Sequence, residues 1–340
     1  MLLCEGKLDS HNAKTAVGLL IWCPEDVVAV VDSTSAGKDL HELVGFGRGI
    51  PIVATVAEAA GCGANQLIVG VANIGGVFVP GYRELISQAI KLRCDIVNGL
   101  HELLTQDGAL VALAAEYGVR LYDLRVVPEG IPCGTNLARR LPNSRLLTVG
   151  TDCNVGKMCA ALALTREFVR RGYDAKFIPT GQTGIMIAGD GLCIDRAISD
   201  FAAGVAEKLV LDQAGHQWLF IEGQGSIDHP SYSGVTLSLL HGSAPQALIL
   251  CHVHSRSRRR HDEGSPLLPL GELIRLYETI STPVLPAKVV GVGVNSRGLS
   301  DAEARDELRR IQDEVDLPAT DPLRFGVDNL TEAVLRFFAG

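Results

Sequence analysis

The sequence predicts an α/β protein with two parallel-sheet domains, residues 1–142 and 143–340. Short runs of apolar, largely β-branched residues alternate with longer amphipathic segments, as in strands that alternate with helices. Polar residues or glycines follow almost every apolar run, which is typical of the ligand-binding edge of a parallel sheet. Pro128, Pro132 and Pro142, with several glycines, mark the linker between the halves.

In the first half, the pattern predicts strands at 26–32, 66–71, 95–97 and 119–123, and helices at 81–92 and 103–117. The carboxyl ends of parallel strands meet at one edge, so polar residues after them are candidates for a substrate pocket. These candidates are Asp32, Ser33, Lys38, Arg48 and His101. A loop cap, a surface charge or a satisfied polar group is the alternative for each. No G-x-G-x-x-G follows the first strand, so a dinucleotide site is not predicted.

The second half repeats the alternation. Its predicted strands are 146–149, 175–178, 218–221, 247–251 and 288–295, and its predicted helices are 160–171, 195–210, 300–315 and 330–338. Ser300 and Glu303 form a capping-box pattern, which indicates the start of the third of these helices.

The most informative stretch is VGTDCNVGKM at 149–158, between a predicted strand and a predicted helix. In such a loop the backbone N–H groups and the positive end of the helix attract phosphate, and a lysine adds a mobile charge. We therefore predict a cofactor phosphate site made by Gly150, Thr151, Asp152, Cys153, Asn154, Val155, Gly156, Lys157 and Met158. A turn that needs glycines only for its geometry is the alternative.

This loop departs from the usual pattern of nucleotide hydrolases. Thr151 stands where the strict spacing has its first glycine, and Met158, followed by Cys159, stands where a serine or threonine hydroxyl would hold magnesium. A thioether is a poor ligand for a hard cation. The loop is thus suited to phosphate but poorly suited to ATP with Mg²⁺, and no metal site is predicted.

Two further loops add polar groups. Residues 179–184, PTGQTG, follow a predicted strand, and Glu222 ends another and opens EGQGS. An acid at a strand end beside a phosphate loop binds a metal or orients a nucleophile, whereas a capping or salt-bridged carboxylate is the alternative. The candidate substrate contacts in these loops are Thr180, Gln182, Thr183, Gly225 and Ser226.

The histidines and arginines around residues 250–260 raise the possibility of a zinc site or a nucleic-acid-binding patch. His252 and His254, with His241 and His261, resemble a zinc site, but no third ligand stands at a suitable spacing, so zinc is not predicted. Arginines are concentrated in SRSRRRH, from 255 to 261, directly before two acidic residues. That pattern predicts a solvated loop rather than a nucleic-acid patch.

Composition narrows the class of protein. A formal net charge of −8 argues against a general nucleic-acid binder, and 47% hydrophobic residues suffice for globular cores. The apolar runs are shorter than a membrane span, and the N-terminus lacks a secretory pattern. Nine cysteines without a C-x-x-C suggest a reducing compartment. We expect a cytoplasmic homo-oligomer that acts on a small molecule, without nucleic-acid or membrane partners.

The pair GTDCNVGK and FIEGQGS resembles the dethiobiotin-synthetase branch of the P-loop proteins, in which the acid of E-G-x-G binds metal. Nearly the whole chain resembles one bacterial family with a Rossmann-like N-terminal domain and a P-loop NTPase-like C-terminal domain. The resemblance rests on VVAVVDSTSAGKDL at 27–40, GRGIPIV at 47–53, NGLHELL at 98–104, VGTDCNVGKM, PTGQTGIMIAGDG at 179–191, FIEGQGSIDHPSYSGVTLSLLHGS at 220–243 and LPATDP at 317–322. Many relatives have threonine where this chain has Cys159.

The family is associated with D-glutamate N-acetyltransferase activity, in D-amino-acid catabolism beside a dehydrogenase. The resemblance therefore implies acetyl-CoA as cofactor and an acidic D-amino acid as substrate. Acetyl-CoA carries phosphates but needs no magnesium, which suits the loop. Asp152 or Glu222 is the candidate base, amides in 181–184 or 223–226 are candidate oxyanion donors, and Lys38 or Arg48 could pair with substrate carboxylates. The alternatives are an ATP-dependent ligase or kinase with Mg²⁺, and a nucleotide-binding protein without turnover.

Overall fold

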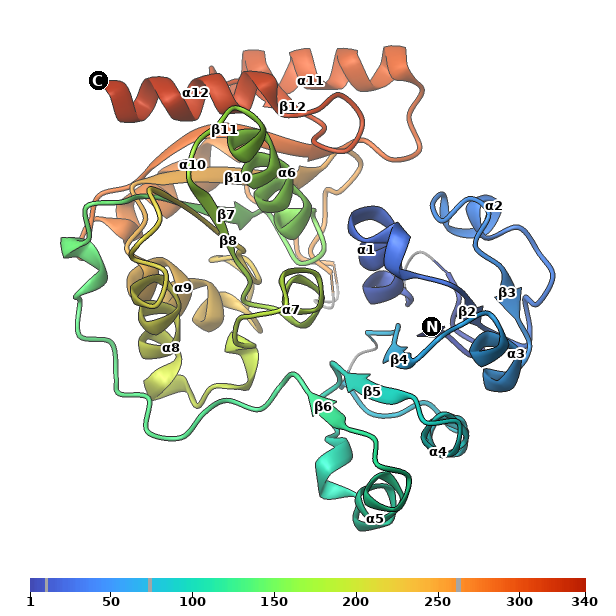
Figure 1. Cartoon of the computed structure of the whole chain (residues 1–340). Helices are drawn as coiled ribbons and strands as arrows, with labels where there is room; N and C mark the ends of the chain where they lie inside the picture. The colour runs from blue at the N-terminus through green and yellow to red at the C-terminus, as the bar shows by residue number, and fades with distance from the viewer. Residues whose placement is uncertain (10–11, 73–74, 261–263) are drawn as a thin grey trace. The chain divides into compact units, whose positions relative to one another are not determined.

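The protein contains two compact units, each built on one six-stranded parallel sheet (Figure 1). The computed structural model describes residues 1–9, 12–72, 75–260 and 264–340. Unit 1 comprises residues 1–126 and 185–196, and unit 2 comprises 127–184 and 197–340. Helices lie between successive strands in both units, so the predicted α/β class is confirmed. The boundary at 142 stays a prediction.

Unit 1 has the strand order β3-β2-β1-β4-β5-β6, which is the order of doubly wound Rossmann sheets. Its strands are β1 Leu2–Leu3, β2 Val30–Val31, β3 Ile52–Val53, β4 Gln66–Val69, β5 Asp95–Asn98 and β6 Leu121–Asp123. Its helices are α1 Lys14–Trp22, α2 Leu40–Val44, α3 Val56–Gly61, α4 Tyr82–Lys91 and α5 Gly108–Tyr117.

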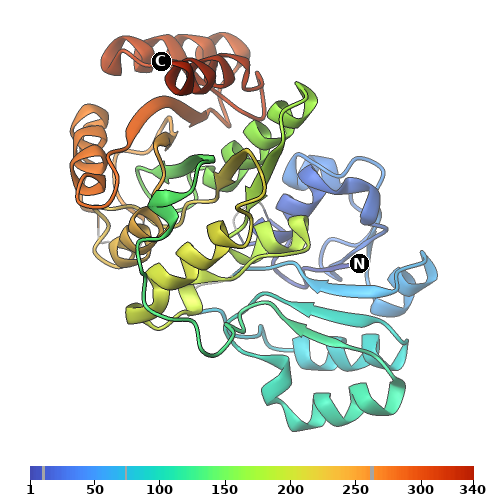
Figure 2. The ribbon, with the colours of Figure 1, turned by 60° about the vertical axis from the view of Figure 1, so that its left-hand side comes forward.

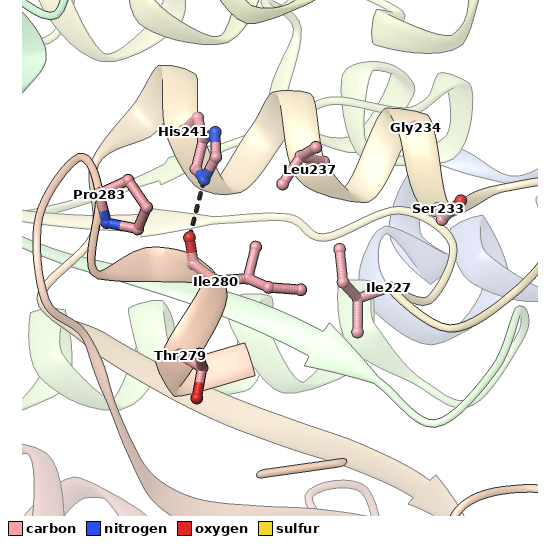
Figure 3. A pocket seen from close by; sticks show the side chains of 8 residues that line it. All are labelled: Ile227, Ser233, Gly234, Leu237, His241, Thr279, Ile280 and Pro283. Atoms are coloured by element: carbon pink, nitrogen blue, oxygen red, sulfur yellow. Dashed lines mark hydrogen bonds between the residues drawn. The ribbon is translucent and has the colours of Figure 1, made fainter. Parts of the chain in front are cut away.

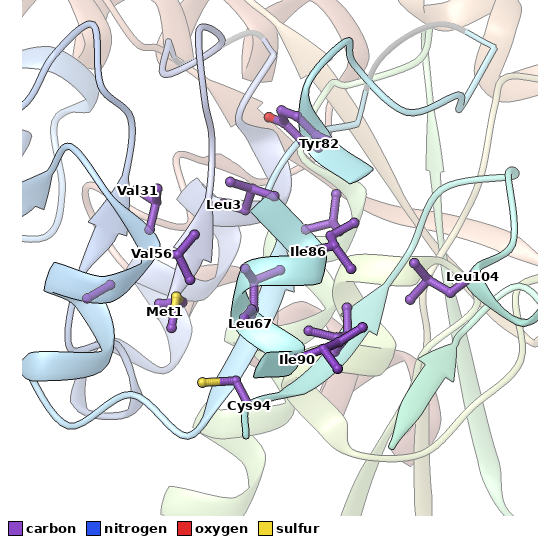
Figure 4. Close-up of a cluster of buried hydrophobic side chains, with 14 of the residues drawn as sticks. Met1, Leu3, Val31, Val56, Leu67, Tyr82, Ile86, Ile90, Cys94 and Leu104 are labelled. Carbon is purple, nitrogen blue, oxygen red and sulfur yellow. The ribbon is translucent and has the colours of Figure 1, made fainter. Parts of the chain in front are cut away.

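Helix α4 shows how the sequence pattern builds the core of unit 1. Tyr82, Ile86, Ala89 and Ile90 recur at helical spacing, and all four are fully buried. Figure 4 shows the side chains of Tyr82, Ile86 and Ile90, which come from α4, in one apolar cluster with Leu67 of β4. Burying each large side chain stabilises the unit by about 1.5–3 kcal/mol.

Several predicted boundaries in unit 1 are wrong for local reasons. The strand predicted at 26–32 shrinks to Val30–Val31, because Pro24–Asp26 form a 3₁₀ turn. The helix predicted from 103 begins at Gly108, where the Asp107 side chain accepts hydrogen bonds from the amides of Ala109 and Leu110. Strands β1 and β3 escaped prediction, since two residues are too few to show a period.

Unit 2 has the order β12-β11-β10-β7-β9-β8. Its strands are β7 Ser144–Gly150, β8 Ala175–Ile178, β9 Trp218–Ile221, β10 Ala247–Val253, β11 Lys288–Asn295 and β12 Ala319–Thr320. Its helices are α6 Lys157–Arg170, α7 Gln182–Ala188, α8 Ser199–Leu211, α9 Ser233–Ser243, α10 Leu270–Ser281, α11 Asp301–Val315 and α12 Asp328–Ala339, and the division between the units falls within α7. Helices α11 and α12, red in Figure 1 and Figure 2, lie side by side.

Prediction is more accurate in unit 2, where the strands are longer. All five predicted strands are present, and the capping box of Ser300 and Glu303 starts α11 as expected. The helix predicted at 195–210 begins at Ser199, because Ile194–Arg196 form a 3₁₀ turn. Residues 182–188 were expected to be loop but form α7, and helices α9 and α10 were not predicted.

A buried carboxylate fixes the segment that leads into β7. Glu207 of α8 accepts hydrogen bonds from Thr135 N and Oγ1 (2.7 Å each), Leu137 N (2.5 Å) and Ala138 N (3.2 Å). Burial opposes ionisation, but the bonds from Thr135, Ala138 and Leu137 outweigh it and lower the pKa of Glu207. The ionised carboxylate therefore holds residues 135–138 against α8.

Replacing Glu207 with Gln is expected to lower the free energy of unfolding by about 1–3 kcal/mol at pH 7, because an amide leaves buried donors unpaired. A carboxyl group whose pKa is lower in the folded state stabilises the folded protein at pH values above its unfolded-state pKa of about 4.3. This stabilisation is lost as the pH falls through the folded-state pKa. Urea unfolding at pH 7 and pH 3.5 should thus show that the difference in free energy of unfolding between wild type and Glu207→Gln is smaller at pH 3.5. Glu272→Gln, at an exposed position of α10, is the control and should change neither value.

Candidate functional site

The phosphate loop lies between β7 and α6, as the sequence predicts. Asn154 and Gly156 have positive φ angles of 54° and 102°, and they turn the chain so that α6 begins at Lys157. Among the described residues, no side chain caps the N-terminus of α6. Its first backbone amides and its dipole are therefore directed at the loop, where they favour an anion.

Lys157 is buried inside this loop. Its ammonium donates to the carbonyl of Asp152 at 2.8 Å, and its side chain is 7% exposed. Burial lowers the pKa of Lys157, while Asp152 and Glu222 are among the groups that oppose the shift. A bound phosphate would add to that opposition, so the lysine and an anionic ligand stabilise each other.

One hydroxyl group ties the phosphate loop to the loop after β9. The Tyr277 hydroxyl donates to the carbonyl of Gly150 at 2.8 Å and accepts from Ile227 N at 3.0 Å. Burial raises the pKa of Tyr277 to about 12, so the phenol keeps its proton and can donate. Tyr277 therefore fixes the two loops to each other.

Glu222 lies at the end of β9, next to β7 in the sheet, and its side chain is buried. Its Oε2 accepts hydrogen bonds from Thr180 N (3.0 Å) and Gly181 N (3.2 Å), and its backbone carbonyl accepts from Thr180 Oγ1 (2.7 Å). Burial raises the pKa of Glu222 to about 7, although the two amide bonds lower it in part. A carboxyl group with this pKa can accept a proton at neutral pH.

Two glycines allow the backbone to pack closely around Glu222. A Cβ at Gly184 would lie 2.4 Å from Glu222 Oε2, and a Cβ at Gly223 would lie 1.6 Å from the carbonyl oxygen of Thr148. The amide of Gly223 also donates to Thr148 Oγ1 at 3.0 Å. The Glu222 carboxyl group therefore packs against the start of α7, while the backbone directly after it packs against β7.

Asp152, the other predicted base, has both oxygens engaged. Its Oδ1 accepts from Cys153 N (2.7 Å), and its Oδ2 accepts from Arg256 Nη1 (3.1 Å) and Arg260 N (2.8 Å). The side chain is fully buried. Taking a proton would weaken these charge-assisted bonds. Asp152 is therefore better suited to hold the loop than to act as a base.

The arginine run after β10 is not the solvated loop that the sequence predicted. Arg256 donates to the carbonyl of Cys153 at 2.5 Å as well as to Asp152, and Arg259 pairs with Asp228 at 2.6 Å. The side chains of Arg256 and Arg259 are 19% and 14% exposed. Sequence periodicity could not reveal this, because it does not show that β10 lies beside β7.

The remaining candidates of unit 2 lie either in 180–183, where Thr180 N donates to Glu222 Oε2, or within four residues of Glu222 along the chain. Thr180 and Gln182 are buried, Thr183 follows in the first turn of α7, and Gln224 Nε2 donates to Thr180 Oγ1 at 3.2 Å. Gly225 has a positive φ of 64°, and the buried Ser226 hydroxyl donates to Asp228 at 2.6 Å. Gln224 was not predicted, although it stands inside the quoted EGQGS.

The candidates of unit 1 are not brought together. Lys38 and Arg48 are exposed in the loops between β2 and β3, whereas His101 follows β5. Strands β1 and β4 lie between β2 and β5, a separation of about 14 Å at ordinary strand spacing. The buried Asp32 accepts from Gly6 N and Thr34 N at 3.1 Å each, as a loop-capping carboxylate does.

His101 belongs to a charged group that the sequence did not reveal. Its Nε2 lies 3.9 Å from Asp195 Oδ2, and Asp195 also pairs with the buried Arg125. Burial, and then Arg125, lowers the pKa of His101. Arg125 comes two residues after β6, so the rule that polar groups follow strands could have identified it.

The histidines of unit 2 contact protein groups. His252 Nδ1 lies 3.1 Å from Thr151 Oγ1, and burial lowers the pKa of His252 to about 4. His241 and His254 bond to the backbone carbonyls of Ile280 and Arg297. His261 lies outside the described residues. Across the described residues, no three His, Cys, Asp or Glu side chains are arranged to bind a metal ion.

A separate hollow of about 560 Å³ lies between α9 and α10 (Figure 3). It is lined by Ile227, Ser233, Gly234, Leu237, His241, Thr279, Ile280 and Pro283. None of these eight residues is an acid, a lysine or an arginine, so the hollow offers no strong phosphate ligand. The candidate site is therefore the phosphate loop with Glu222.

Comparison with known proteins identifies the family. A model described as a Rossmann-like N-terminal domain of unknown function, DUF1611_N, matches residues 33–127, and a P-loop domain, DUF1611_C, matches 132–331. The chain belongs to the DUF1611 family. This confirms the predicted Rossmann-like and P-loop domains. A crystal structure of a DUF1611 family protein from Anabaena variabilis superposes with a TM-score of 0.94 at 36% identity, covering 98% of both chains.

Two relatives of the chain carry a functional name. A protein of Tritonibacter scottomollicae named D-glutamate N-acetyltransferase is 39% identical over 96% of this chain and 95% of its own length. A Pseudoalteromonas protein of the same name is 39% identical over 81% of this chain and 83% of its own. The chain is thus an acyltransferase of the DUF1611 family. Within the described part of the chain, no helix is long and apolar enough to cross a bilayer.

Proposed function

We propose that this protein transfers the acetyl group of acetyl-CoA to the amino group of D-glutamate, in D-amino-acid catabolism. The observation that carries the proposal is a buried carboxyl group, Glu222, with a pKa of about 7 on the strand beside the phosphate loop. The names of the two curated relatives support the same reaction. We further expect a homo-oligomer.

The phosphate loop, 150–158, would hold the pyrophosphate of the coenzyme. Backbone amides at the start of α6 and the buried Lys157 ammonium supply positive potential without a metal ion. Met158 directly follows Lys157 in the first turn of α6, where a nucleotide hydrolase has its magnesium hydroxyl. The loop therefore fits a ligand whose phosphates are anchors and not leaving groups.

Glu222 would then act as the general base. The amine nitrogen of the substrate attacks the thioester carbonyl carbon, a C–N bond forms, and the C–S bond breaks as coenzyme A leaves as a thiolate. The amine proton passes to the Glu222 carboxylate. Its raised pKa makes this transfer favourable near neutral pH.

Oxyanion donors are needed for the tetrahedral intermediate. The amides of Gly181 and Gly223 already donate to Glu222 and Thr148, so we place these donors among 182–184 or 224–226. The proposed substrate contacts are the candidates of unit 2, which are Thr180, Gln182, Thr183, Gly225 and Ser226.

Incubating the purified protein with acetyl-CoA and a panel of D- and L-amino acids, followed by mass spectrometry, tests the proposal. The expected product is N-acetyl-D-glutamate, with weaker or no acetylation of L-glutamate. If no amino acid gains an acetyl group while ATP is consumed in the presence of Mg²⁺, the ligase or kinase alternative replaces the proposal.

Magnesium removal gives a further prediction. Chelation of divalent cations with EDTA is expected to leave the Kd of acetyl-CoA unchanged in calorimetry, since the loop lacks the hydroxyl that would hold a metal. Titrating ATP with and without Mg²⁺ is the control. A metal-dependent gain in acetyl-CoA affinity would contradict a metal-free anion site.

A further inference from the structure

The side chain of Gln224 lies beside the Glu222 carboxyl group, just beyond the end of β9. A Cβ atom at Gly181 would lie 2.6 Å from Gln224 Nε2 and 3.3 Å from Glu222 Oε1, so both side chains approach the same glycine. A residue with a side chain at 181 would push the two groups aside. The Gln224 amide and the Glu222 carboxyl group therefore form one pair, which depends on the glycine between them.

Hydrogen bonds fix the orientation of the Gln224 amide. The Thr180 hydroxyl donates its one proton to the backbone carbonyl of Glu222 at 2.7 Å, so it can only accept from Gln224 Nε2, at 3.2 Å. The amide nitrogen thus faces Thr180 and Glu222, and the amide oxygen, Oε1, faces away from them. Within the part of the chain that the structure describes, no group donates to this oxygen. Because the Gln224 side chain is half-buried and Oε1 is not an enclosed atom, the oxygen is open to a ligand.

The backbone at Gln224 is held in place as well. The Thr236 hydroxyl donates to the carbonyl of Gln224 at 2.7 Å. The next residue, Gly225, has a φ of 64°, and a Cβ there would lie 2.7 Å from the carbonyl oxygen of Tyr232. The chain can therefore turn closely here only with a glycine. The amide is preorganised before any ligand arrives.

The bond from Gln224 favours the ionised form of Glu222. Burial raises the pKa of Glu222 to about 7, and the two backbone amide bonds, the bond from Gln224 and the charge of Lys157 limit that rise. Lys157 is the charged group with the largest effect on Glu222. The first turn of α7, where Gly184 packs against the carboxyl group, contributes only Gln, Thr and Gly at 182–184 and so brings no titratable group.

We propose that Gln224 positions both partners of the proton transfer: its Nε2 holds the Glu222 carboxylate, and its Oε1 accepts a hydrogen bond from the attacking amine. The inference rests on the proposed function. A neutral primary amine has one lone pair and two N–H groups. The lone pair forms the C–N bond as the C–S bond breaks, one N–H proton passes to Glu222, and the other N–H donates to Gln224. A secondary amine has no second N–H, so the site should prefer primary amines.

Two substitutions separate the two bonds of Gln224. Gln224→Leu removes both of them, so the inflection in the pH profile should move upward from about pH 7. Its kcat/KM for D-glutamate should stay about 10–100-fold below wild type even above the inflection, because the amine has lost its acceptor. Gln224→Glu loses the N–H donor but keeps an acceptor. Its like charge should also raise the inflection, and much of the rate should return above it.

Steady-state kinetics from pH 6 to pH 10 measure both effects, and N-methyl-D-glutamate provides a second readout. Wild-type protein should prefer D-glutamate to the N-methylated substrate, and Gln224→Leu should reduce that preference. Gln217→Leu is the matched control, since Gln217 is exposed directly before β9, at the opposite end of the same strand. It should keep the wild-type pH profile and the wild-type preference.

The outcomes separate this inference from the proposed function. A Gln224→Leu variant with the wild-type inflection and rate overturns the role of Gln224 and leaves the acetyltransferase proposal standing. If Gln224→Leu does not fold, an unshifted inflection in Gln224→Glu overturns that role instead. A wild-type protein that acetylates no amino acid overturns both proposals. Thermal unfolding and an unchanged Kd of acetyl-CoA show that each variant is measured as folded protein.

Discussion

Replacing Glu222 with Gln is expected to lower kcat for acetyl transfer by about 10²–10⁴-fold, the usual contribution of a positioned general base. The amide matches the carboxyl group in size and can still accept bonds from Thr180 N and Gly181 N, so the loops should stay in place. The Kd of acetyl-CoA should change little. Steady-state kinetics with D-glutamate and calorimetry with acetyl-CoA measure the two quantities separately.

Asp321→Asn is the matched control for this variant. Asp321 is a buried carboxylate at the end of β12 in the same sheet, and it accepts from Ser296 N at 2.9 Å. Three strands lie between β12 and β9, so the change should affect stability but not kcat. A Glu222→Gln enzyme with the wild-type rate would remove Glu222 from the reaction.

The pH profile provides an independent check on Glu222. Burial raises its pKa to about 7, so the group is protonated below that pH and cannot accept a proton from the amine. The rate of acetyl transfer should therefore fall as pH decreases through about 7, and this inflection should be absent from the residual activity of Glu222→Gln. A wild-type profile that is flat between pH 6 and pH 8 would argue for a different base.

Lys157→Met is expected to weaken acetyl-CoA binding by about 10–100-fold, because it removes a charged donor to phosphate from a buried site. Methionine retains much of the apolar stem, so packing beside Gly223 should persist. The loss of affinity should be smaller for acetyl-pantetheine, which lacks the pyrophosphate. Calorimetric titration with both donors provides the comparison.

The control for this variant is Lys208→Met, which removes an exposed ammonium paired with Asp212 on α8 at 2.9 Å. Surface pairs of this kind contribute little, so affinity should be unchanged. Equal affinity of Lys157→Met and wild-type protein for acetyl-CoA would be incompatible with a phosphate-binding role for the loop.

The sequence predicted the local structure correctly where a residue with a clear chemical role stands directly after a recognisable strand. The run from Leu146 through Lys157 places a strand, a glycine-bearing loop and a helix start in one continuous segment, and the structure has β7, the loop and α6 there. Glu222 was identifiable because an acid that directly follows a buried strand must lie at the ligand edge of a parallel sheet. Both features are local in the chain.

Features that depend on strand order could not be predicted. Arg256 reaches Asp152 only because β10 pairs with β7, and residues 104 positions apart meet as a result. The link between Tyr277 and Gly150 spans 127 positions for the same reason. The helix at 182–188 was missed for a different cause: Gly184 weakens the local helical preference, yet it is needed for the close approach to Glu222.

The Tyr277 hydroxyl has a thermodynamic consequence. Because a single oxygen atom bonds both Gly150 and Ile227, the chain segments on either side of the reaction cannot shift independently. Occupancy by the acyl donor and occupancy by the amine should then be energetically coupled, with each raising the affinity for the other by the same factor. Tyr277→Phe would uncouple the two binding events. The Kd of the acyl donor would then no longer depend on whether the amine is bound, and the reverse would also hold.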